Sequence, residues 1–298
     1  MDRVTAALTA PDSYLWFPQL TYDLARTEWQ RLEEETGITQ SEYGTERVIL
    51  NDTNAPRNII YTLLIKNQVE DVKGTISIEL LPKTVTDQYK ESGVSFYTLE
   101  EFLSKGHIRN QILDCLTGAL NIIRQVPSLF ATVACQVKSI HLIKLESDDY
   151  DVSFSEPNIP FSIFVSVPQK KHLANSLRVA EAIVHEATHL QLTLIEKIVP
   201  LVFNTGNEYY SPWRAEYRTA GGVLHALYVF RVVESFFREL LRRNLFSEQN
   251  ADYLNERKRE ICVQIDEIHH FSDCPDLTLP GKIFVQNLIK PDINTKGF

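Results

Sequence analysis

Hydrophobic and polar residues recur with two periods along this chain, and the shorter period marks the strands. Segments rich in β-branched residues, or with apolar residues at every second position, are typical of β-strands. The clearest case is FSIFVSV, where Phe161, Ile163, Val165 and Val167 share one face. The pattern predicts strands over residues 59–65, 75–81, 139–145, 150–154 and 161–167.

The longer period, with apolar residues three and four apart, predicts the helices. A capping box of Thr98 and Glu101 begins a helical region that ends near Gln125, before Pro127, and that Gly106 divides. Other helices are expected over residues 17–35, 175–198, 223–241 and 248–270, with a short terminal element at 281–288. Residues 201–210 are expected to form a loop. Because no Pro/Gly/Ser-rich linker interrupts this series, we predict one α+β domain over residues 1–298.

Composition narrows the class of protein. The 298 residues are 44% hydrophobic and 23% charged, as in soluble globular proteins. A net charge of −9 without a basic stripe argues against nucleic acid as a partner. We see neither a signal peptide nor an apolar run of about 18 residues, so no membrane association is expected. The four cysteines lack CxxC spacing and are expected to be reduced thiols of a cytoplasmic protein.

The candidate chemistry lies in HEATH, in the middle of the predicted helix 175–198. His185 and His189 are four residues apart, so a helix brings both imidazoles to one face, where they can reach one metal ion. In a zinc peptidase, Glu186 would be the general base for a metal-bound water. Two histidines hydrogen-bonded in the core are the plain alternative. Against it, unpaired polar groups on this otherwise apolar helix would be costly without a ligand.

Two protein ligands rarely suffice for a metal, so a third is expected. The HExxHxxGxxH class is excluded, because Leu192 and Ile195 occupy its glycine and third histidine positions. Spacing leaves Glu208, Glu216 and His225 as candidates. Either glutamate would suit a zinc peptidase of the gluzincin type. A closed four-ligand zinc site would instead suit a non-catalytic peptide-binding protein.

Three segments carry a family resemblance: HEATHLQLTLIEKIVPL, SPWRAEYR and GGVLHALYVF, in this order and spacing. They resemble the HExxH family of peptide-modification proteins, which occur in gene neighbourhoods for ribosomally made, post-translationally modified peptides. IPFSIFVSVP and LTLPGKIFVQNL are also similar, and the resemblance covers about residues 135–290. It implies a zincin-like small sheet beside the HExxH helix. It also implies an Fe(II)- and 2-oxoglutarate-dependent oxygenase that hydroxylates a residue of a precursor peptide, using dioxygen.

The resemblance also implies roles for single residues. His185, His189 and His225 match the family's metal ligands, and Arg214 and Arg218 match the arginines of its PWR-type segment. Two positions depart from the pattern: Thr219 stands where proline is expected, and Ala226 where glycine is expected. The first departure affects the loop that carries Arg218, so Arg214 is the stronger candidate for 2-oxoglutarate. Glu186 would then orient a ligand or substrate rather than act as the base of a hydrolysis.

The implied chemistry is consistent with the residue types. Three histidines leave open positions on a metal, although imidazole suits zinc as well as iron. Arginine binds a carboxylate through two hydrogen bonds, as the free carboxylate of 2-oxoglutarate would require. The alternative is that Arg214 and Arg218 form surface ion pairs with Glu216 or Glu208. Strand 161–167, if it is an exposed edge, could hold an extended peptide by strand addition.

Overall fold

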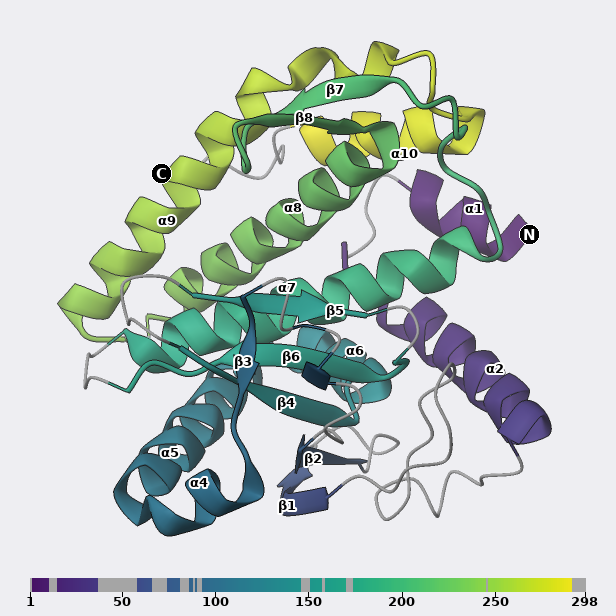
Figure 1. Cartoon of the computed structure of the whole chain (residues 1–298). Helices are drawn as coiled ribbons and strands as arrows, with labels where there is room; N and C mark the ends of the chain where they lie inside the picture. Colours follow the sequence, from purple (N-terminus) through teal and green to yellow (C-terminus); the bar gives the residue numbers. More distant parts are fainter. Residues whose placement is uncertain are drawn as a thin grey trace.

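A mixed β-sheet lies beneath a stack of long helices (Figure 1), which confirms the predicted α+β class. The structure is a computed structural model. It describes residues 2–10, 15–36, 58–65, 74–80, 86, 87, 89, 93–145, 151–156, 159–169, 174–244 and 246–290. One continuous cluster of buried apolar residues reaches from Val4 to Leu288 across these segments. The extent of the domain, from residue 1 to 298, stays a prediction.

The sheet of the described residues has six strands in the order β1-β2-β4-β6-β5, with β3 also paired to β4. Strand β4 runs parallel to β2 and β6, whereas β1 and β5 are antiparallel to their neighbours. The strands are β1 (Asn58–Ile65), β2 (Gly74–Leu80), β3 (Ser95–Phe96), β4 (Ser139–Lys144), β5 (Ser153–Ser155) and β6 (Ser162–Ser166). Each predicted strand overlaps an observed one. Leu81 and Tyr150, at two predicted ends, lie outside the described residues.

Strand 161–167 was considered for peptide binding on the condition that it is an exposed edge of the sheet, and this condition is not met. Strand β5 pairs with β6, with Ser153 opposite Val165, so β5 is the edge strand. All five residues of β6 are buried, as is usual for a strand with a neighbour on each side and a covered face.

The described helices follow the predicted ones closely, with two additions. They are α1 (Asp2–Thr9), α2 (Pro18–Thr36), α4 (Leu99–Ser104), α5 (Gly106–Ile123), α6 (Pro127–Gln136), α7 (Asn175–Glu196), α8 (Ala220–Arg243), α9 (Glu248–Glu267), the 3-10 turn η2 (His269–Asp273) and α10 (Leu279–Ile289). The capping box of Thr98 and Glu101 is present, and Gly106 begins α5. Helices α1 and α6 were not predicted. Pro127 begins α6, because proline fits the first helical turn.

Helix α7, which carries HEATH, lies between the sheet and the outer helices (Figure 1). It packs on β5 and β6, while α8 packs on α7 and α9 packs on α8. Among the described helices, only α8 has the length and apolar character of a membrane span. Because 78% of its apolar window is buried, it packs as a core helix.

A short hairpin, β7 (Glu208–Ser211) and β8 (Glu216–Thr219), leads directly into α8. Its first strand corrects the expectation of a loop over residues 201–210. Thr219 is the N-cap of α8, and its Oγ1 accepts a hydrogen bond from the Gly222 amide at 3.2 Å. The helix therefore starts before the predicted residue 223.

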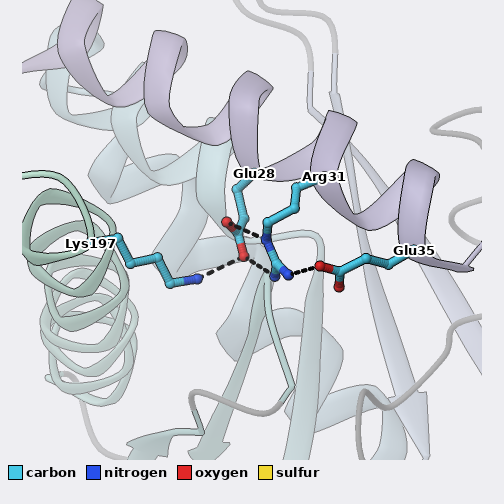
Figure 2. A network of polar contacts seen from close by, with 4 residues as sticks. All are labelled: Glu28, Arg31, Glu35 and Lys197. Carbon is cyan, nitrogen blue, oxygen red and sulfur yellow. Dashed lines mark hydrogen bonds and ion pairs between the residues drawn. The ribbon is translucent and has the colours of Figure 1, made fainter.

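A network of charged side chains fastens α2 to the end of α7 (Figure 2). The buried carboxylate of Glu28 accepts hydrogen bonds from Lys197 Nζ and Arg31 Nη2, each at 2.7 Å. Arg31 also contacts Glu35. Since Lys197 is the C-cap residue of α7, this network anchors the helix that presents HEATH.

Candidate functional site

Three histidines lie in a row where α7 meets α8. The Nε2 atoms of His185 and His189 are 3.2 Å apart, and the Nδ1 atoms of His189 and His225 are 3.1 Å apart. At the end of the row, His225 Nε2 is 2.8 Å from Glu196 Oε2. The structure therefore brings together the three histidines that the sequence singled out.

All these contacts can be satisfied with neutral rings. A neutral imidazole has one N–H donor and one acceptor nitrogen. His185 Nε2–H can donate to His189 Nε2, and His189 Nδ1–H can donate to His225 Nδ1. His225 Nε2–H can then donate to Glu196 Oε2, so each contact has one proton. Burial lowers the pKa of His185 to about 4, and the cations of Arg257 and Arg214 act in the same direction. Burial, together with the neighbouring His185 and His225, also holds the pKa of His189 well below its usual value.

The donor set fits a metal ion in its chemistry. Neutral imidazoles have free lone pairs, and metal–nitrogen bonds of about 2.1 Å place two neighbouring ligand nitrogens about 3.0–3.4 Å apart. The Nε2 atoms of His185 and His189 have this separation. His189, however, turns its other nitrogen to His225, and within the described ranges no three His, Cys, Asp or Glu side chains form a metal-binding group. One ring must turn before all three histidines can share one ion.

Glu186 lies beneath the edge strand β5. Its side chain is 2% exposed, and the Ser153 hydroxyl donates to Oε1 at 2.7 Å. Burial raises the pKa of Glu186 to about 7, although hydrogen bonds from Ser153 and Ser155 oppose the shift. Its Oε1 is 3.9 Å from His185 Nε2. A carboxyl group with this pKa can exchange a proton near neutral pH.

The two glutamates proposed as third ligands are on the hairpin. Glu208 is on β7 and Glu216 on β8, and both are exposed. Glu216 lies 3.7 Å from Arg218. In the described part of the chain neither glutamate contacts a histidine of the row, whereas His225 does.

Arg214 and Arg218 differ in their surroundings. Arg214 is exposed in the turn of the hairpin, and its guanidinium has no hydrogen bond or ion pair with the described residues. Burial is the main cause of the lowered pKa of His185 and His189, and the positive charge of Arg214 acts in the same direction. Arg218 lies against the start of α8, where a Cβ on Gly222 would be 3.4 Å from Arg218 Nε. The surface ion pair considered as an alternative is therefore present for Arg218 alone.

Sequence reasoning missed Glu196, the hydrogen-bond partner of His225. It comes seven residues after His189, so the helical repeat places both on one face of α7. A carboxylate bonded to one nitrogen of a histidine fixes the ring and its tautomer, as partners of metal-bound histidines do. The spacing of His185, His189 and Glu196 could have identified it.

A second missed group forms a wall beside His185. The ring of Phe230 meets His185 at 5.1 Å between centroids and stacks on Trp213 at 5.2 Å. The Arg257 guanidinium lies 5.6 Å from the Phe230 centroid, and Arg257 Nε donates to Glu181 at 2.9 Å. These residues come from α7, the hairpin turn, α8 and α9, so no local sequence pattern connects them.

The chain was also compared with known proteins. No protein-family model matches the sequence, and no curated protein matches it.

Proposed function

We propose that the protein is an Fe(II)- and 2-oxoglutarate-dependent oxygenase that hydroxylates a side chain of a ribosomally made precursor peptide. The observation that carries this proposal is the contact between His225 and His189. It favours three histidine ligands over a set completed by Glu208 or Glu216. Such a set leaves metal positions open for a co-substrate and dioxygen.

In this proposal His185, His189 and His225 hold the metal, and Glu196 orients His225. When bound, iron and 2-oxoglutarate together supply the activation of dioxygen. Arg214, whose guanidinium is unpaired in the described part of the chain, binds the free carboxylate of 2-oxoglutarate. The aromatic wall of Trp213 and Phe230 limits the access of water from the side of His185.

The edge strand β5 is the proposed place for the peptide. It is the terminal strand of the sheet and contacts α7, and Ser153 bonds to Glu186 next to His185. An extended peptide that pairs with β5 would lie beside the histidine row. Glu186 would orient that peptide or a ligand. The four described cysteines are free, in agreement with the proposed cytoplasmic location.

A zinc peptidase is the second candidate, and one observation favours it. Burial raises the pKa of Glu186 to about 7, which suits a general base. This candidate needs a third ligand, and both exposed glutamates proposed for that role lie on the hairpin.

Binding of 2-oxoglutarate tests the proposal without an identified peptide. We expect calorimetry without oxygen to show one 2-oxoglutarate bound per Fe(II)-loaded chain, and much weaker binding to metal-free protein. A His189→Ala variant should lose this metal-dependent binding. Equal binding with and without metal, or none, would contradict the proposal.

A further inference from the structure

Asp276 is a buried carboxylate whose side-chain partners all come from one short segment. Asp276 as a whole residue is 3% exposed to solvent. Asp276 Oδ2 accepts hydrogen bonds from Thr205 Oγ1 at 2.6 Å, Tyr209 OH at 2.8 Å and Asn207 Nδ2 at 3.1 Å. These bonds lower the pKa of Asp276. Since a buried carboxylate is costly unless it is hydrogen-bonded, the segment 205–209 is held to this one side chain.

The backbone of the segment is shaped for this contact. Gly206 has a φ of +79°, in the left-handed region that favours glycine. Thr205 and Asn207, on either side of Gly206, both donate to the same carboxylate.

Backbone contacts join the same two parts of the chain. The Phe203 amide donates to the Asp276 carbonyl at 2.7 Å, and the Thr278 amide donates to the Leu201 carbonyl at 3.0 Å. A Cβ on Gly281 would lie 2.0 Å from the Leu201 oxygen, so only glycine permits this approach. Asp276 thus anchors the chain directly before β7.

The hairpin needs such an anchor because it has little buried surface of its own. All four residues of β8 are exposed, and Ser211 is the one buried residue of β7. Tyr209 on β7 is bonded to Asp276 at one end, and Thr219 caps α8 at the other. Between these two attachments the hairpin turn carries Trp213, which stacks on Phe230 beside His185, and Arg214 follows Trp213 directly in the chain.

We propose that Asp276 is a positioning residue of the candidate site. It fixes the β7–β8 hairpin so that Arg214 reaches the anionic co-substrate beside His185. The identity of that co-substrate rests on the proposed function, whereas the anchoring of the hairpin does not.

The test compares Asp276→Asn and Asp276→Ala in the full chain, with Asp273→Asn as the matched control. Asp273 is an exposed aspartate in the same segment. We expect amide hydrogen exchange of residues 207–219 to become at least about tenfold faster in both Asp276 variants, because hydrogen bonds to a charged acceptor are lost. Exchange in α7 and the Fe(II) content should not change. The dissociation constant for 2-oxoglutarate should rise about tenfold, since Arg214 is no longer held in place.

Tyr209→Phe serves as a second variant, because it removes one donor and keeps the carboxylate. It should change hairpin exchange in the same direction by a smaller factor. Unchanged hairpin exchange in folded Asp276→Ala would overturn the proposal, as would equal acceleration in α7 or in the Asp273→Asn control. If the wild-type chain does not bind 2-oxoglutarate, the proposed function fails, while the exchange comparison still decides whether Asp276 anchors the hairpin.

Discussion

His225 lies directly against His189, with 3.1 Å between their Nδ1 atoms, although 36 residues separate them in the chain. This contact exists because α8 packs along α7 and places its second turn beside HEATH. The carboxylate of Glu196, also on α7, bonds to the far nitrogen of His225. The two helices together therefore present three imidazoles and one orienting carboxylate.

We predict that His225→Ala loses bound metal as severely as His185→Ala. Each variant removes one of the three proposed ligands, whereas Glu208→Gln and Glu216→Gln change exposed hairpin residues and should keep the metal. Metal content after loading with Fe(II) in the absence of oxygen measures the effect, and the exposed His107→Ala is the control. If His225→Ala keeps its full metal content while Glu208→Gln or Glu216→Gln loses metal, the third ligand is a carboxylate. That result would favour the peptidase.

Glu186→Gln should retain the metal and reduce turnover about 10- to 100-fold, the usual effect of losing a group that orients ligands. The glutamine can still accept the hydrogen bond that Ser153 donates to Glu186. Metal content, 2-oxoglutarate binding and succinate formation are the measurements. Complete loss of turnover, with metal and 2-oxoglutarate still bound, would argue that Glu186 is an essential base.

Arg214→Ala should raise the 2-oxoglutarate concentration needed for half-maximal turnover by at least about tenfold, because one charge-assisted carboxylate contact disappears. Metal content should stay the same. Arg218→Ala should have a smaller effect, since Arg218 already lies near Glu216 at 3.7 Å. The exposed Arg26→Ala is the control. An unchanged requirement in both Arg214→Ala and Arg218→Ala would remove these arginines from the co-substrate site.

The network of Figure 2 gives a prediction about stability and pH. Burial alone would raise the pKa of Glu28, but hydrogen bonds from Arg31 and Lys197 outweigh it and leave this pKa below the usual value of 4.5. The ionised carboxylate therefore stabilises the fold above pH 4.5, and this contribution is lost as pH falls through the lowered pKa. Glu28→Gln should lower the free energy of unfolding by about 1–2 kcal/mol at pH 7.

Urea denaturation of wild type and Glu28→Gln at pH 7 and at a pH below the lowered pKa checks this prediction. The difference should shrink at the lower pH, because wild-type Glu28 is then protonated as well. The exposed Glu35→Gln should change stability by less than about 0.5 kcal/mol. If Glu28→Gln lowers the free energy of unfolding equally at both pH values, the loss comes from packing and not from the charge of Glu28.

Periodicity predicted the elements with long, regular patterns. The HEATH helix was expected over residues 175–198 and is α7, Asn175–Glu196, because apolar residues repeat along its whole length. The strands β4 and β6 were found for the same reason. Local patterns do not distinguish the end of a helix before Pro127 from the start of α6 at Pro127, because proline follows helix ends and also fits the first turn of a new helix.

The hairpin and the edge of the sheet could not be predicted from local patterns. Strands β7 and β8 have four residues each and are mostly exposed, so they lack the alternation that marks a half-buried strand. Strand β5 has three residues, and its place beside β6 depends on pairing between distant segments. In the described part of the chain, that pairing makes β5, rather than strand 161–167, the edge of the sheet.

Part of the candidate site could be predicted because helical spacing is local. His185 and His189 are one turn apart, and Glu196 follows on the same face of α7. In contrast, the contact of Phe230 with His185 and that of Arg257 with Phe230 depend on the packing of α8 and α9. A contact of this kind becomes visible only when the tertiary structure is known.

Mass spectrometry of a precursor peptide tests the central claim most directly. The peptide is incubated with the full chain, Fe(II), 2-oxoglutarate and air, and each component is omitted in turn. The account predicts a gain of one oxygen atom on a peptide side chain that needs Fe(II), 2-oxoglutarate and air, with one succinate formed for each oxygen added. Cleavage of the peptide by the zinc-loaded protein, independent of 2-oxoglutarate and of air, would contradict the account.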